Sequence, residues 1–224
     1  MTAGRGRTGR PPLTEERKAE IRLEIAHAAV RLFVTQGVAA TTGEQIGQAV
    51  GVSARTVWRY FPSKESCVRP LLMAGVELIA DALRRWHPGR PLDEVFDFDS
   101  GAGSDSGPGG ETGTGGRLLA GPDRATVGAL VRLTRTEPGL RAVWLQTHDE
   151  AEPAFARALA ERAGLPAGDL RPAIQAAMFN GALRAAVEHH AWHTAATPAD
   201  PATARAELAA TLRSALAVVA EGVG

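Results

Sequence analysis

Apolar residues recur every three to four positions along most of this chain of 224 residues. This spacing places them on one face of an α-helix, and no segment shows the strict alternation of apolar and polar residues that is typical of a half-buried strand. In the first such segment, Ile21, Ile25 and Leu32 share a face. Thr14 can cap its start, and Gly37 is expected to end it. The pattern therefore predicts an all-α protein.

Two short helices are predicted next. Thr42 stands three residues before Gln45, which is a capping box that opens a segment ending at Gly51. Ser53 can cap a second segment, which Pro62 ends. The turn between the two segments is about three or four residues long and contains a glycine, which is typical of a helix-turn-helix.

Longer helices are predicted in the rest of the chain. They are expected over residues 63–86, 126–135, 138–163, 170–193 and from Pro201 onward, the last one capped by Asp200. Pro153 is expected to kink the helix that contains it. Residues 99–117 consist almost entirely of Gly, Ser, Thr and acidic residues, so they are predicted to form a disordered surface loop. Residues 1–13 hold three arginines among glycines and prolines, which predicts a flexible basic arm.

Charge is distributed unevenly along the chain, although the net charge is zero. Residues 1–70 hold eleven Lys and Arg against six Asp and Glu, a net charge of +5, and residues 71–224 hold the compensating −5. The basic end is the candidate nucleic-acid face. A basic face that is merely solvated is the alternative on charge alone.

Residues 53–61 have the features of a recognition helix. Val57 and Phe61 lie four residues apart and face inward, whereas Arg55 and Arg59 form an outward ridge. Arginine pairs bidentately with guanine in the major groove, so Arg55 is the first candidate for base readout and Arg59 the second. A solvated surface position is the alternative for both arginines.

Other side chains in this region are candidates for contacts with phosphates or thymine methyl groups. Trp58 and Tyr60 fit such contacts, with a place in the core as the alternative. The arm could enter an adjacent minor groove through Arg5, Arg7 and Arg10, or it could remain solvated. The predicted DNA-binding residues are Thr42, Ser53, Ala54, Arg55, Thr56, Trp58, Arg59, Tyr60 and Lys64.

An ordered set of residues in this half of the chain resembles the N-terminal domain of TetR-family regulators. The resemblance covers about residues 14–67, and its ordered combination is more specific than any single motif. It is carried by Ile25, Ala28, Ala29, Leu32, Phe33, Gly37, Thr41, Thr42, Ile46, Gly51, Val52, Ser53, Thr56, Tyr60, Phe61, Ser63, Lys64 and Glu65.

The chain also departs from the family pattern. Trp58 stands where the family usually has Tyr or Phe, and Cys67 replaces the usual Leu. Pro70 is atypical so early in the fourth helix. Gly43 and Gly47 are expected to loosen the second helix, at a cost of about 1 kcal/mol each relative to Ala.

The resemblance implies a sequence-specific transcriptional regulator that binds a near-palindromic double-stranded DNA operator as a homodimer, with repression as the expected sense. A small-molecule inducer in the C-terminal body would change the separation of the two recognition helices and release the operator. The implied organisation is a flexible arm at 1–13, a three-helix DNA-binding domain with the helix-turn-helix at 14–66, and a helical ligand-sensing and dimerisation domain at 67–224.

The C-terminal body holds candidates for both of these roles. Two rows of residues at i+4 spacing resemble the paired last helices of the family's dimers, with an internal core seam as the alternative. These rows are Ala173, Ala177, Gly181 and Ala185, and Leu208, Leu212 and Leu216. The candidate ligand-binding residues, for which an ordinary core position is the alternative, are Trp86, Trp144, His148, Met178 and Phe179.

Cysteine and histidine are the residues to consider for disulfide or metal chemistry. Cys67 is the single cysteine, so no intrachain disulfide or cysteine cluster for zinc can form. His189 and His193 could grip one metal ion from a helix face, but a favourable charge at a helix C-terminus is the preferred interpretation. Neither a metal nor a cofactor is therefore predicted.

An enzyme and a DNA-binding protein without a ligand are the two rival functions. No nucleophile elbow, zinc-binding helix motif or phosphate loop is found, so an enzyme is not predicted, with acid–base chemistry beside His148 as the alternative. A DNA-binding protein that senses no ligand is a further alternative. The chain shows no signal peptide and no apolar run of roughly 20 residues, so a cytoplasmic protein without membrane contact is expected.

Overall fold

The computed structural model describes residues 14–86, 123–166, 168–194 and 200–221, and within these ranges every regular element is a helix. The fold is all-α, as the sequence predicts. The predicted arm at 1–13 and the predicted loop at 99–117 lie outside the described residues.

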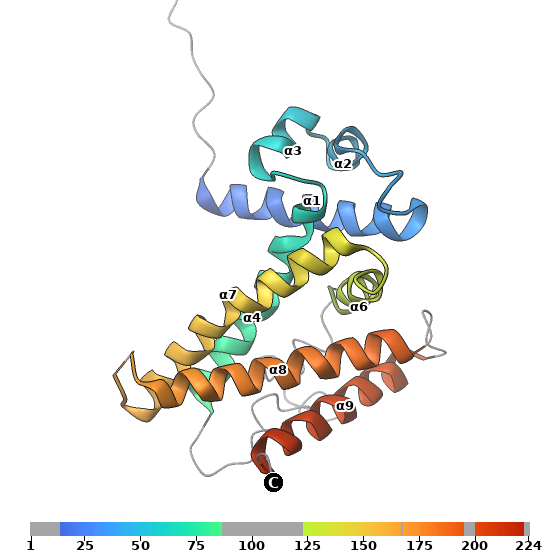
Figure 1. The fold of residues 1–224 in the computed structure, drawn as a ribbon. Helices are drawn as coiled ribbons and strands as arrows, with labels where there is room; N and C mark the ends of the chain where they lie inside the picture. The colour runs from blue at the N-terminus through green and yellow to red at the C-terminus, as the bar shows by residue number, and fades with distance from the viewer. Residues whose placement is uncertain (1–13, 87–122, 167, 195–199, 222–224) are drawn as a thin grey trace, which may run out of the picture.

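Three N-terminal helices, α1 (Glu15–Gln36), α2 (Gly43–Ala49) and α3 (Ala54–Tyr60), gather at one end of the molecule, at the top of Figure 1. Two helices, α4 (Arg69–Arg85) and α7 (Pro138–Ala163), lie side by side and run from this end to α8 (Leu170–His193) and α9 (Pro201–Glu221) at the other (Figure 1). The described residues also include α6 (Asp123–Leu133).

Short polar side chains begin these helices where the sequence predicts. The Thr42 hydroxyl accepts from the Gln45 amide at 3.3 Å while the Gln45 side chain accepts from the Thr42 amide at 2.9 Å, so the capping box is complete. Ser53 accepts from the amide of Thr56 at 3.2 Å, and Asp200 accepts from that of Thr203 at 2.8 Å. Each cap provides an acceptor for an amide that has no partner inside the helix.

The prediction of one continuous helix from Ser63 is wrong. The chain instead forms a short 3-10 helix, η1 (Glu65–Val68), before α4 begins. The hydroxyls and amides of Ser63 and Ser66 bond reciprocally at 3.1 and 3.2 Å, which closes a tight turn. Pro70 lies in the first turn of α4, where its missing N–H costs no hydrogen bond.

The inner face of α1 forms the centre of one apolar core. Ile25 and Phe33 of α1 pack with Val57 of α3, and the same core includes residues of η1, α4, α6, α7 and α8. Cys67 is part of it, and burial raises the pKa of its thiol to about 12, so it packs as a small apolar side chain. Packing is continuous across the domain boundary that the sequence predicts at 66.

A second core joins α4, α7, α8 and α9. Phe155 and Phe179 meet edge to face in it, with ring centroids 5.6 Å apart. Leu212 and Leu216 of α9 are buried in this core, and Leu208 packs against it. The leucine row of α9 is therefore an internal seam, which is the alternative that the sequence analysis left open.

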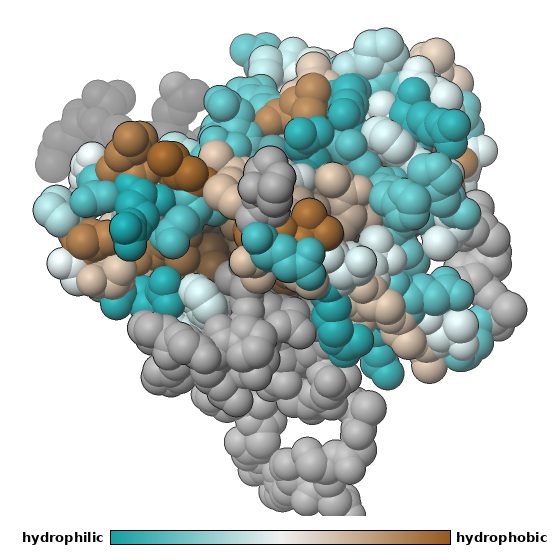
Figure 2. All heavy atoms as spheres, turned by 60° about the horizontal axis from the view of Figure 1, so that its bottom comes forward, coloured by the Kyte–Doolittle hydropathy of each residue, from teal (hydrophilic) through white to brown (hydrophobic). Residues whose placement is uncertain are grey.

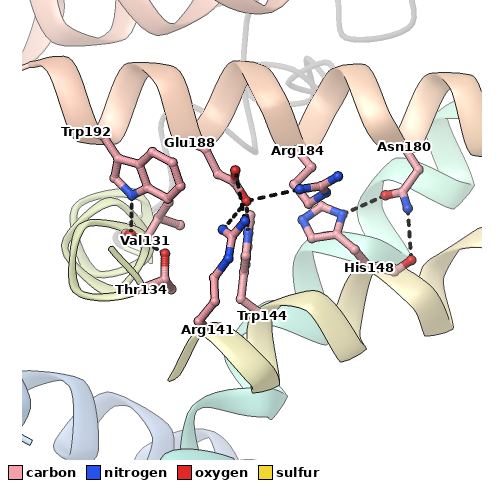
Figure 3. Close-up of polar contacts among 9 residues, drawn as sticks. All are labelled: Val131, Thr134, Arg141, Trp144, His148, Asn180, Arg184, Glu188 and Trp192. Atoms are coloured by element: carbon pink, nitrogen blue, oxygen red, sulfur yellow. Dashed lines mark hydrogen bonds and ion pairs between the residues drawn. The ribbon is translucent and has the colours of Figure 1, made fainter. Parts of the chain in front are cut away.

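A buried carboxylate ties α7 to α8 (Figure 3). Glu188 of α8 accepts from Trp144 Nε1 at 2.7 Å and from Arg141 Nη1, and the guanidinium of Arg184 lies 3.6 Å away. Trp192, one turn further along α8, donates to the carbonyl of Val131 in α6 at 3.0 Å. The polar contacts therefore fix α8 against both α7 and α6 near the first core.

His148 continues this network along α7. Its Nδ1 lies 2.6 Å from Asn180 Oδ1, and Asn180 donates to the His148 carbonyl at 2.9 Å (Figure 3). Asn180 also donates to Glu152 at 3.0 Å. The imidazole also meets the Trp144 ring edge to face at 4.3 Å between centroids. Burial lowers the pKa of His148 below its ordinary value of 6.5, so the neutral ring is the form that the fold favours.

Replacing Glu188 by Ala is expected to lower the free energy of unfolding by about 3 kcal/mol, because Arg141 and Trp144 lose their buried acceptor. The control is Asp149→Ala on the exposed side of α7, which is expected to cost less than about 0.5 kcal/mol. Urea denaturation measures both variants. Equal losses would show that the Glu188 network contributes no more than a surface carboxylate.

Acidification is expected to destabilise the fold through His148. The unfolded chain protonates this histidine near its ordinary pKa of 6.5, whereas the folded chain resists protonation, so stability is complete above that value and falls as the pH drops below it. The His148→Gln variant should show a flatter loss of unfolding free energy between about pH 8 and about pH 5. A slope as steep as that of the wild type would assign the acid sensitivity to other groups.

Candidate functional site

Helices α2 and α3 form a helix-turn-helix whose geometry depends on two glycines. Gly51 in the turn has a φ of +74°, a conformation that glycine adopts without strain. Gly47 accepts from the Val52 amide at 2.9 Å, and a β-carbon at Gly47 would lie 2.6 Å from the Val52 carbonyl oxygen. The expectation that Gly47 loosens α2 is therefore wrong, because its missing side chain lets the turn close against the helix.

One face of α3 is anchored and the other is open. Val57 is fully buried and Phe61 nearly so, whereas Arg55, Trp58 and Arg59 are exposed. The exposed residues are spaced three and four apart, so they lie on one side of the helix. The structure thus places both predicted base-reading arginines and Trp58 together on the outer ridge of an anchored helix.

Tyr60 is only partly buried and lies between two arginines. The guanidinium of Arg22, from α1, is 5.3 Å from the ring centroid, and that of Arg59 is 5.0 Å from it. Arg59 Nη2 also lies 3.4 Å from the Tyr60 hydroxyl. Arg59 is therefore held against its neighbour, while Arg55, one turn nearer the start of α3, stays exposed.

The remaining predicted DNA-binding residues divide into two groups. Thr42 and Ser53 are exposed caps at the starts of α2 and α3, and Ala54 and Thr56 are partly buried beside them. The Lys64 side chain is turned towards the protein. Its ammonium lies 2.6 Å from the Val38 carbonyl, 3.2 Å from that of Thr41 and 3.4 Å from that of Ala39. Lys64 thus holds the loop before α2 instead of pointing outward. Arg5, Arg7 and Arg10 lie outside the described residues.

The five candidate ligand residues lie in different surroundings. Trp144 and His148 face α8 within the polar network, and Phe179 is buried in the second core. The Trp86 ring is covered by the guanidinium of Arg162, 4.1 Å from its centroid. Met178 is 39% exposed, whereas its neighbour Phe179 is buried.

A cleft of about 760 Å³ lies elsewhere, where α1, the start of α4 and α7 meet. Its walls include Arg22, Tyr60, Arg69, Met73 and Glu150, and Arg69 pairs with Glu150 across it. None of the five candidate ligand residues lines this cleft. Its walls come from segments that lie far apart in the sequence, so no local pattern indicates it.

The described residues contain neither a metal-binding cluster nor a membrane-spanning helix. No group of three or more His, Cys, Asp or Glu in the described ranges could hold a metal ion. His189 and His193 stack with centroids 4.4 Å apart, and His193 Nδ1 lies 2.8 Å from the His189 carbonyl instead of pointing to a shared site. Among the helices that the structure describes, none is long and apolar enough to cross a membrane.

Comparison with known proteins agrees with this arrangement. Residues 25–71 match the family model of bacterial regulatory proteins of the tetR family, and residues 122–224 match that of the MftR C-terminal domain. The chain is 33% identical over 171 residues to the HTH-type transcriptional regulator TcmR of Streptomyces glaucescens, which covers 75% of this chain and 72% of TcmR.

A solved structure shows the same fold. The chain is similar to Salmonella enterica GusR with a TM-score of 0.52 and 19% sequence identity, over 91% of this chain and 96% of that one. The two family models together cover both the helix-turn-helix and the helical body described above. The chain therefore belongs to the TetR family of bacterial transcriptional regulators.

Proposed function

We propose that this regulator represses transcription by binding a near-palindromic operator as a homodimer, and that a small molecule bound in the helical body releases it. The observation that carries the proposal is the ridge of Arg55, Trp58 and Arg59 on a helix whose other face is fully anchored. A recognition helix needs this combination of rigidity and outward donors to read bases in a major groove. Membership of a family of regulators favours this function over the enzymatic alternative.

Arg55 is the proposed base reader, because its side chain is exposed at the N-terminal end of α3. In helix-turn-helix proteins the first residues of the recognition helix contact the base edges. Thr42 and Ser53 cap the neighbouring helix starts, which is where backbone amides and hydroxyls can bind phosphates. Arg59 is the second proposed base reader, and its guanidinium must move away from the Tyr60 ring to contact DNA.

The proposed dimer interface is the outer face of α8 and α9. Large apolar side chains are exposed there: Leu170 at 71%, Ile174 at 50% and Val218 at 62%. Figure 2 brings this side of the molecule forward and shows hydrophobic side chains gathered among polar ones. The row of small residues on α8 lies on the same exposed face, since Ala173, Ala177 and Ala185 are all exposed. An apolar face of this kind is stabilised when a second copy covers it.

The proposed effector would act through the helices that join the body to α1. Helices α6 and α7 contribute Leu130 and Leu140 to the core around α1, so a shift of either helix is transmitted to α3. The network around Glu188 fixes the position of α7 against α8 in the same region. The alternative is a regulator without an effector. The affinity of such a protein for DNA would not change with any metabolite tested.

Selection from a random DNA pool is expected to enrich a palindrome, and Arg55→Ala is expected to relax the preference at one position per half-site by about 1–3 kcal/mol. The matched control is Arg157→Ala on an exposed part of α7, which should leave the enriched sequence unchanged. DNA binding that shows no sequence preference and weakens with salt would contradict the proposed role of α3.

Replacing Ile174 by Glu is expected to convert the dimer to a monomer at micromolar concentration, because a charge would be buried in the proposed interface. The control is Val34→Glu, the same change at an apolar position on α1 that is 53% exposed. Light scattering should show two chains for the wild type and the control and one chain for the Ile174 variant. A wild-type mass of a single chain would rule out the dimer.

A further inference from the structure

Two departures from the family pattern, Gly43 and Trp58, meet in the structure. Gly43 is the first residue of α2 and is buried, while Trp58 lies on α3. A β-carbon on Gly43 would lie 2.0 Å from Trp58 Cζ2, 2.5 Å from Cε2 and 2.8 Å from Cη2. Carbon atoms in contact are normally about 3.5–4.0 Å apart. The indole ring thus occupies the space of any side chain that another residue would place at 43.

Trp58 is not a core residue in spite of this contact. Its side chain remains 43% exposed, on the same ridge as Arg55 and Arg59. One edge of the ring packs on the backbone at the start of α2, directly after the exposed cap Thr42. Because Nε1 is bonded to Cε2, the indole N–H belongs to the edge that meets α2. The contact therefore restricts the orientation of the ring and of its only hydrogen-bond donor.

We propose that Gly43 is a positioning residue for Trp58, and that the seated indole is a DNA contact held ready before DNA binds. This inference rests on the proposed reading of DNA by α3. A ring that is already held in one orientation loses little conformational entropy on binding, so its contact gains affinity at low cost. Gly43 acts on DNA only through Trp58.

The composition of α2 supports a role beyond helix formation. Alanine has a higher helix propensity than glycine, so helix formation alone gives no reason for a glycine at 43. Gly75 of α4 offers the contrast, since a β-carbon there would meet no atom within 4 Å. The same Gly→Ala change therefore has opposite expected effects at the two positions.

The test is a double-mutant cycle on Gly43→Ala and Trp58→Ala, with affinity measured on the DNA that the wild-type protein enriches. Gly43→Ala is expected to weaken binding about tenfold in the wild-type background, and not at all in the Trp58→Ala background, where no ring is left to displace. Gly75→Ala should leave affinity unchanged. Equal losses from Gly43→Ala in both backgrounds would overturn the inference, because Gly43 would then act independently of the ring.

Fluorescence separates positioning from general loss of structure. The difference between the fluorescence emission with Trp58 and that with Trp58→Phe is the emission of this indole alone. This emission is expected at longer wavelength in the Gly43→Ala background, because the displaced ring is more hydrated. Unchanged emission together with unchanged affinity would overturn the inference while leaving the proposed function intact. A wild-type protein that enriches no DNA sequence would instead overturn the proposed function, and with it any role of Trp58 on DNA.

Discussion

The apolar core around α1 is the constraint on which the rest of the structure depends. Ile25 and Phe33 are almost fully buried, and they are covered by Val57 of α3 and by residues of α4, α6 and α7. Each such side chain contributes roughly 1.5–3 kcal/mol through burial, so the helices on this core are held together strongly. Helix α3 and the helical body consequently share one core, and this shared core is the route by which the proposed effector would act on α3.

Glycines set the close geometry of the helix-turn-helix on this core. Gly51 makes the turn and Gly47 lets the turn approach α2, while Gly43 leaves room for the ring of Trp58. A helix with this composition is weak by propensity alone, and tertiary contacts compensate. Gly43 and Trp58, which look like unrelated exceptions in the sequence, are one structural feature.

Much of the fold could be predicted from the sequence, because helix starts depend on local chemistry. The caps at Thr14, Thr42 and Ser53 and the bounds of α7 and α8 follow from hydrogen bonds and periodicities that lie within a few residues. The break before α4 was missed, because the turn that Ser63 closes with Ser66 competes with a helix of similar local preference. Periodicity shows which face of a helix is apolar, but it does not show which neighbour covers that face. For this reason the leucine row of α9 could not be assigned.

The candidate site was predictable to the same extent. The outward ridge of α3 follows from helical spacing, and the resemblance to the family supplied its role. The contacts of Lys64 could not be predicted, because the carbonyls that hold its ammonium lie more than twenty residues away in sequence. The partners of His148 and Trp144 on α8 are similarly distant. Long-range polar contacts of this kind leave no pattern in one sequence, so the effector site remained the least predictable part.

Methylation interference on the enriched DNA tests the placement of α3 most directly. Methylation of guanine N7 blocks the major groove, whereas methylation of adenine N3 blocks the minor groove. If α3 of each protomer enters a major groove, N7 methylation should exclude the protein at two positions related by the centre of the palindrome and about one helical turn apart, or a multiple of it. Interference confined to adenine N3, or none at either position, would contradict the assignment of α3 as the reading helix.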